Sequence, residues 1–311
     1  MTERFAQAVY QLAGREPHCV TGRETDDDFS FSLSGIGRFR VNMFRQRGSI
    51  AAVVRVISFG LPTAEEAHIP PEVMQVADMK KGIVLVTGAA GSGKSTTLAC
   101  IINQINHSRS GHILTLEDPV EYIHRHGQCI ISQREIHIDC PSYVAALRSA
   151  LRESPDVILL GEMRDRETME VAMTAAETGQ LLLSSLHTTG AANTIDRIID
   201  AFPPNQQSQI RLQLSMVLQA VISQQLVPGV DGQPIPAFEI MYTTMAIRNM
   251  IRESKTHLLE SAIASGGAMG MRTMDMALTE LVTQGKITKE AALTHCVNYE
   301  TMKNRLGMTG V

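Results

Sequence analysis

The sequence predicts an α/β protein whose larger part is a parallel sheet flanked by helices, and two observations carry this prediction. From Gly82 onward, short apolar runs alternate repeatedly with segments of helical periodicity, which is the pattern of strands and crossover helices. The first apolar run, residues 83–86, leads into a glycine-rich loop that is followed at once by a helical segment. The chain has 311 residues, which is ample for a sizeable core and a second, smaller domain.

A small α+β region is predicted before this part. Residues 2–12 place their apolar side chains on one side of a helix, and the acidic run at residues 26–28 is typical of a solvated turn. Alternating segments then predict a small antiparallel sheet. Its strands are expected at residues 29–33, 38–44 and 49–57, with a turn at residues 34–37 and a linker at residues 59–63.

The larger part is predicted to alternate strands and helices as far as a helical C-terminal region. Strands are expected at residues 83–86, 112–116, 157–160 and 181–185, with a further apolar segment at 235–242. Helices are expected at residues 96–106, 143–151, 167–178, 191–199 and 205–226, with three or four more from Thr244 onward. The predicted domains are therefore residues 1–59, 60–243 and 244–311.

The glycine-rich loop is a complete G-x-x-x-x-G-K-S motif between a strand and a helix. Its glycines let the backbone N–H groups converge on one centre, and the helix N-terminus behind them favours an anion. Lys94 can reach the β- and γ-phosphates of a nucleotide, and the Ser95 hydroxyl can hold Mg²⁺. The predicted nucleotide-binding residues are Gly88, Ala89, Ala90, Gly91, Ser92, Gly93, Lys94, Ser95 and Thr96.

Polar residues follow three further predicted strands, and parallel strands end at the same edge of a sheet. Glu162 follows the strand at 157–160, where a carboxylate lies beside Mg²⁺ in phosphate-loop folds. An acidic cluster that includes Glu121 follows the strand at 112–116, and a carboxylate there can deprotonate water. His187 ends the strand at 181–185 and can donate to the γ-phosphate. The competing interpretations are an acidic loop that caps the next element and a structural histidine.

Three arginines, Arg38, Arg40 and Arg55, lie in the small predicted sheet. Alternation places Arg38 and Arg40 on one face. A solvated basic face is the default interpretation of this pattern. The alternative is an arginine supplied to phosphate across a closing interface, which strongly accelerates phosphoryl transfer.

Composition excludes several classes of protein. The net charge of −4 argues against a nucleic-acid-binding protein, which normally carries a basic footprint. The five cysteines lack C-x-x-C spacing, so neither a zinc site nor a disulfide framework is indicated, and free thiols fit a reducing cytoplasm. No apolar run approaches the ~20 residues of a membrane span.

Four segments together resemble the family of type II secretion and type IV pilus ATPases. They are HILTLEDPVEY from His112, LRESPDVILLGEMRD from Leu151, ETGQLLLSSLHTT from Glu177 and AIRNMIRE from Ala246. The last segment is similar to the motif that marks the PilT-type, twitching-motility retraction branch, and the absence of paired C-x-x-C motifs favours the same branch. Within AIRNMIRE, apolar residues form one helical face, with Arg248 and Asn249 largely on the other.

The resemblance implies a RecA-like ATPase domain preceded by a PAS-like domain, assembled as a homohexamer that uses ATP and Mg²⁺. It implies a cytoplasmic protein, peripheral at the inner face of the cytoplasmic membrane, whose partner is the inner-membrane platform protein of the pilus machinery. No nucleic-acid partner and no membrane span are expected.

The resemblance also implies roles for the residues. Lys94 and Ser95 would hold phosphate and Mg²⁺, and Glu162 would lie on the Mg²⁺ side, directly or through water. Glu121 would be the general base, and His187 would sense phosphate. The arginines at 38, 40 and 55 become candidates for contacting nucleotide after domain closure.

The chain departs from the family pattern at three places. Gln180 stands where the His box commonly has a first histidine, and Met250 stands where leucine is usual. The family's first few dozen residues have no counterpart, so the PAS-like domain is expected to be incomplete. Two rival functions stay open: a RecA-like nucleic-acid translocase, which the net acidity opposes, and a nucleotide-binding regulatory subunit with little turnover, which intact Lys94, Glu121 and Glu162 oppose.

Overall fold

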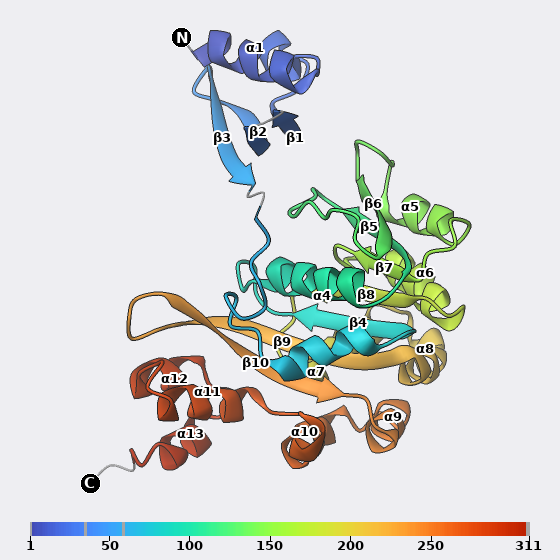
Figure 1. Cartoon of the computed structure of the whole chain (residues 1–311), viewed down its shortest axis with the longest axis vertical. Coiled ribbons are helices and arrows are strands. Elements are labelled where there is room, and N and C mark those ends of the chain that lie inside the picture. The colour runs from blue at the N-terminus through green and yellow to red at the C-terminus, as the bar shows by residue number, and fades with distance from the viewer. Residues whose placement is uncertain (1, 34–35, 58–59, 309–311) are drawn as a thin grey trace. The chain divides into compact units, whose positions relative to one another are not determined.

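The structure is a computed structural model that describes residues 2–33, 36–57 and 60–308 (Figure 1). Two compact units make up the chain. The N-terminal unit comprises Met1–Leu61 together with Asp118–His124, and the core unit comprises Pro62–Glu117 and Arg125–Val311. The predicted α/β class is confirmed, whereas the three-part domain division stays a prediction. The predicted turn at 34–37 and the predicted linker lie partly outside the described residues.

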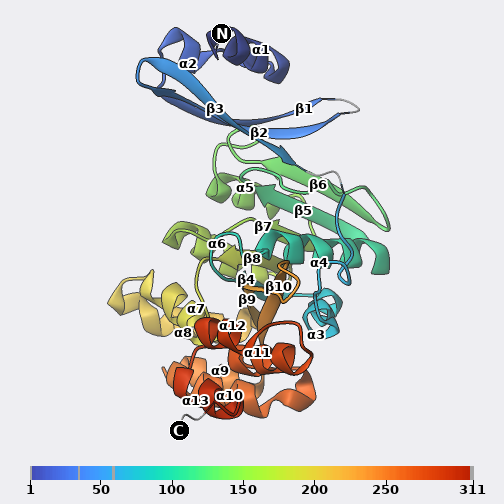
Figure 2. The ribbon, with the colours of Figure 1, turned by 90° about the vertical axis from the view of Figure 1, so that its left-hand side faces the viewer.

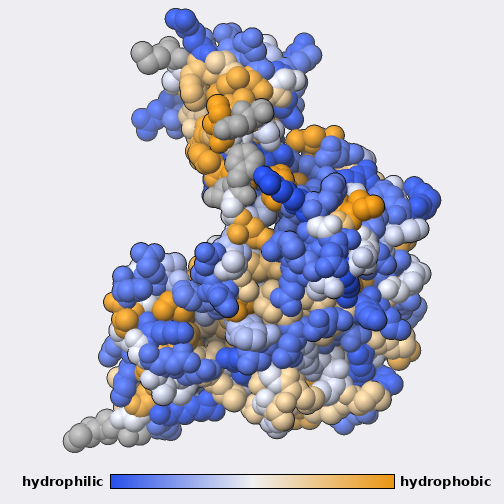
Figure 3. All heavy atoms as spheres, in the orientation of Figure 1, coloured by the Kyte–Doolittle hydropathy of each residue, from blue (hydrophilic) through white to orange (hydrophobic). Residues whose placement is uncertain are grey.

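Helices and a three-stranded antiparallel sheet form the N-terminal unit, as the alternating pattern predicts. Tyr10 on the first helix stacks on Phe29 of the sheet at a ring separation of 5.2 Å. The edge strand exposes Val53, Val54 and Val56, and hydrophobic atoms gather on the visible face of this unit (Figure 3). The elements are α1 (Thr2–Ala13), α2 (His18–Thr21), β1 (Asp26–Leu33), β2 (Gly37–Gln46) and β3 (Ser49–Ile57), in sheet order β1-β2-β3.

The prediction of a turn at the acidic run, residues 26–28, is wrong. These residues begin β1 and pair with Asn42–Phe44 of β2. The Asp27 side chain is only 4% exposed, and its Oδ1 accepts a hydrogen bond from Arg15 at 2.9 Å. Sheet pairing and this ion pair offset the burial of the carboxylate, which is why an acidic run can begin a strand here.

A seven-stranded sheet organises the core unit, in the order β10-β9-β4-β8-β7-β5-β6. All neighbours are parallel except β10, which runs antiparallel to β9. The central strands β4, β8 and β7 are buried on both faces, which accounts for their continuous apolar sequences. The bounds are β4 (Gly82–Thr87), β5 (Gly111–Glu117), β6 (Cys129–Glu135), β7 (Val157–Leu160), β8 (Leu181–Leu186), β9 (Leu218–Pro228) and β10 (Pro234–Tyr242).

Helices cover both faces of this sheet (Figure 2). Helices α5 to α8 share one hydrophobic cluster with the side chains of Ile83 and Leu85, so they cover the face to which these residues point. Helix α4 packs against β4, β5 and β8 and buries Ile101, Ile102 and Ile105. The bounds are α3 (Pro71–Met74), α4 (Lys94–Ser108), α5 (Tyr143–Ala150), α6 (Arg166–Glu177), α7 (Ala191–Asp200) and α8 (Pro204–Val217), with a 3-10 turn η1 at Gln75–Asp78.

One prediction for this unit is wrong, and one of its strands was not predicted. The helix expected at residues 205–226 ends at Val217, and the chain continues without a break as β9, because this apolar segment pairs with β4. Strand β6 was not predicted, since as an edge strand it mixes exposed, half-buried and buried residues.

The C-terminal region holds five α-helices among the described residues, where three or four were expected. Helices α11 to α13 lie together against the β9–β10 hairpin (Figure 1), sharing a cluster with Val227 and Ala237. No helix of residues 2–308, as far as they are described, has the length and apolarity to cross a membrane. The bounds are α9 (Met245–Arg252), α10 (Leu259–Ser265), α11 (Met274–Thr283), α12 (Lys289–His295) and α13 (Tyr299–Arg305), with 3-10 turns η2 (Thr256–Leu258) and η3 (Gly267–Met269).

The AIRNMIRE segment is helix α9, but its faces differ from the prediction. Ile247 and Ile251 are fully buried, whereas Ala246 is exposed. Arg248, predicted on the polar face, turns inward: its guanidinium donates to the carbonyl oxygens of Ser215 and Met216, the latter at 2.8 Å, and to Gln219 Oε1 at 3.2 Å. Arg248 therefore completes the C-terminal end of α8, where carbonyl groups lack helical partners.

Candidate nucleotide site

The glycine loop curls tightly between β4 and α4, and two of its glycines are required by close contacts. At Gly88, with φ of 146°, a Cβ would lie 2.1 Å from the Gln224 carbonyl oxygen and 2.6 Å from Ser92 Oγ. At Gly93, with φ of 88°, it would lie 2.8 Å from Gln224 Nε2. Only glycine combines these backbone angles with such close approach, so the loop conformation is built into the sequence.

Lys94 is the first residue of α4 and is 7% exposed. Its Nζ donates to the carbonyl oxygens of Gly88 and Ala89, both at 2.9 Å, and lies 3.4 Å from His187 Nδ1. Two neutral carbonyls hold the ammonium at the loop, and a phosphate oxygen offers it a stronger, charge-assisted bond.

The start of α4 fits a phosphate group. Gly93 at the N-cap provides no side-chain cap, so the N–H groups and the helix dipole face outward. Within the described residues, the buried Ser92 Oγ has no hydrogen-bond partner. An uncapped helix start, a buried hydroxyl and the Lys94 ammonium together form a donor set suited to an anion.

Glu162 and His187 lie close to Lys94, as predicted from the shared edge of parallel strands. Glu162 follows β7 after one residue, and its side chain is 13% exposed. His187 directly follows β8, and its Nε2 lies 3.3 Å from Glu162 Oε2, while Arg164 pairs with Glu162 Oε1. A continuous series of contacts thus runs from Lys94 through His187 to Glu162.

Ser95 lies in the first turn of α4, beside Lys94. Among the residues that the structure describes, there is no group of three or more His, Cys, Asp or Glu side chains that could hold a metal ion. Mg²⁺ needs no such group, because it commonly uses one or two protein ligands together with phosphate oxygens and water. Ser95 and Glu162 fit that pattern, and their role toward Mg²⁺ stays a prediction.

The other predicted site residues belong to the N-terminal unit. Arg40 lies directly opposite Arg55 in the sheet register, and Arg38 lies two residues from Arg40 on the same face. Arg40 Nη2 pairs with Asp28 at 2.8 Å, and Arg38 Nη2 donates to Ser30 Oγ at 2.7 Å. The alternation argument for one arginine face is therefore confirmed.

Glu121 lines a cavity of about 200 Å³ in this unit, together with Arg40, Arg55 and Tyr122. The pKa of Arg40 is raised, chiefly by its hydrogen bond to Asp28 and further by the charges of Asp28, Asp118 and Glu121. The acidic cluster that includes Glu121 begins with Glu117, which is the last residue of β5 and belongs to the core unit. Glu117 Oε1 accepts a hydrogen bond from Thr115 at 2.6 Å. Base catalysis by Glu121 stays a prediction.

Gln180, the departure in the His box, immediately precedes β8, whereas His187 follows it. A strand of this length places the two residues roughly 20 Å apart. The Gln180 Oε1 accepts a hydrogen bond from Thr178 in the turn after α6, at 2.7 Å. A direct role for this position beside His187 is therefore excluded within the subunit.

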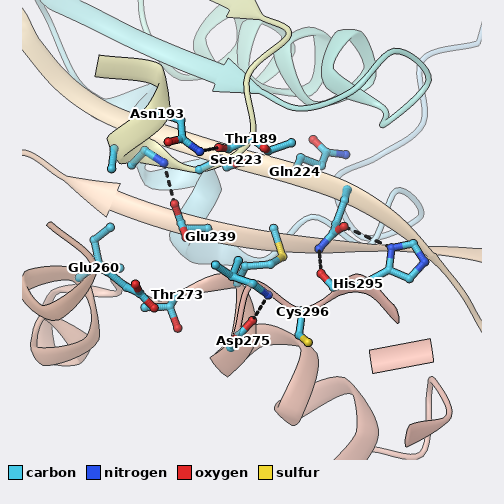
Figure 4. A pocket seen from close by; sticks show the side chains of 17 residues that line it. Thr189, Asn193, Ser223, Gln224, Glu239, Glu260, Thr273, Asp275, His295 and Cys296 are labelled. Atoms are coloured by element: carbon cyan, nitrogen blue, oxygen red, sulfur yellow. Dashed lines mark hydrogen bonds between the residues drawn. The ribbon is translucent and has the colours of Figure 1, made fainter. Parts of the chain in front are cut away.

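A second cavity, of about 460 Å³, lies between β9, the start of α7 and the C-terminal helices (Figure 4). Its buried carboxylates already have partners: Glu239 Oε1 accepts from Ala191 N at 2.7 Å, and Asp275 accepts from the backbone of Val297 and Asn298. Burial raises the pKa of Glu239. These carboxylates are occupied in joining elements, and they form no cation site.

Gln224, which lines this cavity, was not predicted as a site residue from the sequence. It is 4% exposed and touches the glycine loop at both ends. The polar run Ser223-Gln224-Gln225 at the end of an apolar segment was a signal, but it lay within a segment that was predicted as helix.

A strand, a glycine loop and a helix that begins with lysine, next to a carboxylate and a histidine at neighbouring strand ends, define a phosphate-loop NTPase with a parallel-rich sheet. The profile of the type II/IV secretion system protein family matches residues 45–299. The chain belongs to the type II/IV secretion system protein family.

Individual proteins similar to this chain support the same family assignment. The chain is 50% identical over 267 residues to the type IV pilus retraction ATPase PilT of Pseudomonas aeruginosa, covering 86% of this chain and 78% of that protein. It is 49% identical to a twitching motility protein of Neisseria gonorrhoeae, covering 96% of this chain and 80% of that protein. A crystal structure of the pilus retraction motor PilT with bound ADP superposes with a TM-score of 0.90 at 43% identity, covering 97% of this chain and 86% of that one.

Proposed function

We propose that this protein is a Mg²⁺-dependent ATPase that powers retraction of type IV pili and hence twitching motility. The observation that carries the proposal is the contact series from Lys94 through His187 to Glu162 behind a complete glycine loop. The similarity to a retraction ATPase and to a twitching motility protein over most of the chain supports the proposal that ATP hydrolysis drives movement of the pilus.

In this proposal the core unit binds and positions the nucleotide. Lys94 and the N-terminal N–H groups of α4 hold phosphate oxygens, and Ser95 and Glu162 hold Mg²⁺, directly or through water. Bound ATP with Mg²⁺ supplies the phosphoryl group whose transfer to water releases free energy. Because Lys94 Nζ lies between the loop carbonyls and His187 Nδ1, drawing the ammonium toward phosphate changes the surroundings of His187, which touches Glu162.

The N-terminal unit supplies the remaining groups. Glu121 accepts the proton of the attacking water at its carboxylate. Arg38 and Arg40 are held by Ser30 and Asp28, whereas Arg55 is exposed on the edge strand. Arg55 is therefore the arginine that turns most easily toward a phosphate, with Arg38 and Arg40 as further candidates.

The working form is a homohexamer at the inner face of the cytoplasmic membrane, acting on the platform protein of the pilus machinery. Ligand-dependent movement of one unit against the other converts hydrolysis into mechanical work. The membrane attachment in this proposal is peripheral and made through the platform protein.

The experiment is a gene deletion in the protein's own host, complemented with the wild-type chain or with Lys94→Ala. We expect the deletion to abolish twitching while surface pili persist, and only the wild-type chain to restore movement. Purified wild-type chain should hydrolyse ATP only when Mg²⁺ is present. Normal twitching in the deletion strain would reject the pilus assignment, and absence of turnover in the purified protein would reject the ATPase assignment.

A further inference from the structure

A buried glutamine touches the glycine loop from the neighbouring strand. Strands β9 and β4 run parallel, with Thr87 paired to Ser223, so Gln224 lies one residue past the end of β4 and beside Gly88. Its carbonyl oxygen and its side-chain amide occupy the space that a Cβ would need at Gly88 and Gly93. Gln224 is thus in contact with both ends of the loop.

The same side chain bonds to helix α4. Thr97 Oγ1 donates to Gln224 Oε1 at 2.7 Å, and both residues are buried, at 1% and 4% exposure. Thr97 is one turn from Gly93, to whose carbonyl its own N–H donates at 3.1 Å. The bond therefore fixes the first helical turn, which carries Lys94 and Ser95, against β9.

We propose that Gln224 is a positioning residue for ATP hydrolysis, which holds the glycine loop and the first turn of α4 at the phosphate-binding geometry through its bond to Thr97. The inference rests on the proposed ATPase function. Loop N–H groups and Lys94 remain when the bond is lost, so nucleotide binding persists. Turnover depends on finer geometry, since a displacement of about 1 Å at reacting groups can slow a reaction roughly 10²-fold.

The neighbouring residue offers a matched control. The Gln225 side chain bonds to His295 at the end of α12: its Nε2 donates to the His295 carbonyl at 2.9 Å, and its Oε1 lies 3.2 Å from Nδ1. His295 and Gln224 lie toward the same end of the cavity (Figure 4). Gln225 has the same chemistry on the same strand, but its side-chain amide bonds to the C-terminal helices.

The test compares Gln224→Met with Gln225→Met in the full-length protein, because methionine keeps the length and removes the amide. We expect Gln224→Met to lower kcat by about tenfold or more, with a smaller change in KM for ATP, and Gln225→Met to keep kcat within about twofold. Thermal unfolding of both variants reports stability separately. A folded Gln224→Met with wild-type kcat, or an equal loss in both variants, would overturn the proposal.

A second pair of variants tests the bond itself. Thr97→Val removes the hydroxyl at nearly constant volume and should reproduce the kcat loss of Gln224→Met, whereas Thr97→Ser keeps the donor and should retain turnover. Combining Thr97→Val with Gln224→Met should add little, because both remove one interaction. Fully additive losses, or equal losses in the Ser and Val variants, would contradict the assignment. If the wild-type chain itself lacks turnover, the proposed function fails instead.

Discussion

The predicted site residues fall into two groups, one in each unit, and the two groups are held in different ways. In the core unit, Lys94, His187 and Glu162 stand at the ends of buried strands or the start of a helix, and His187 lies within 3.4 Å of both Lys94 and Glu162. In the N-terminal unit, the three arginines share one sheet face, where Arg40 and Arg55 line a cavity with Glu121, and the side chains of the Arg40–Asp28 pair are 37% and 46% exposed.

This difference bears on how each group can work. Packing positions Lys94 and Glu162 before any ligand arrives, which is the arrangement that electrostatic catalysis needs. His187, whose side chain is 54% exposed, is held instead by its contacts with these two residues. An ion pair as exposed as that of Arg40 contributes only about 0–1 kcal/mol, so breaking it to reach another partner costs little. The core unit is thus suited to precision, and the N-terminal unit is suited to groups that change partners.

The largest effect is expected from removing Lys94 from the core-unit group of site residues. Lys94→Ala should reduce ATP turnover by roughly 10²–10³-fold or more and weaken nucleotide binding, because it removes the cation aimed at the phosphates. Turnover and fluorescent-nucleotide binding would be measured beside Lys81→Ala, an exposed lysine before β4. Wild-type turnover in Lys94→Ala would show that this loop is not the active site.

The next prediction compares one carboxylate from each unit, Glu121 from the N-terminal unit and Glu162 from the core unit. Glu121→Gln should retain ATP binding and lose about 10²-fold in turnover, because an amide keeps the size of the base and loses its basicity. Glu162→Gln should lower turnover and shift its dependence on Mg²⁺ concentration. Glu170→Gln, on the exposed side of α6, is the control. If only Glu162→Gln is impaired, the base belongs to the core unit.

A third comparison concerns packing. Ile247→Ala should lower the free energy of unfolding by about 2–5 kcal/mol, since the side chain is fully buried. Val54→Ala, on the 44% exposed edge position of β3, should change it by less than about 0.5 kcal/mol. Both values follow from denaturant unfolding curves. Equal effects would show that β3 is covered in the protein in solution.

The smallest effect depends on pH and lies in the N-terminal unit. Burial lowers the pKa of His124 from 6.5 to about 4. The unfolded chain therefore binds the proton first as pH falls, so stability is lost progressively between pH 6.5 and 4. His124→Gln should flatten the thermal unfolding midpoint across this range, whereas exposed His257→Gln should not. An unchanged pH profile in His124→Gln would contradict the burial of this group.

The glycine loop and the strand-end residues could be predicted because each has a local signature: a motif, an apolar run, and a polar residue directly after it. The end of α8 could not, because residues 205–226 are compatible with a helix and only pairing with β4 and β10 makes the second half a strand. The acidic start of β1 escaped prediction because its partner, Arg15, lies elsewhere in the chain.

Gln224 illustrates the limit of motif reading for the site. Only a short polar run, Ser223-Gln224-Gln225, marks this position in the sequence. The role of Gln224 depends on its hydrogen bond to Thr97, which lies 127 residues away in the chain. The separation of Glu121 from Glu162 into different units was equally hidden, because residues 118–124 leave the core unit for only seven positions. Both features depend on tertiary arrangement rather than on local sequence.

The guanidinium of Arg248 has a consequence for the synthesis of the chain. Helix α8 ends at Val217 and β9 begins at the next residue, so two of the carbonyl groups at this junction depend on Arg248 for their bonds. As the chain emerges from the ribosome, this junction stays incomplete until α9 has followed it out. A fragment that stops at residue 243 would lack the hydrogen bonds of Arg248 permanently, so the sheet and the AIRNMIRE helix are expected to fold as one unit.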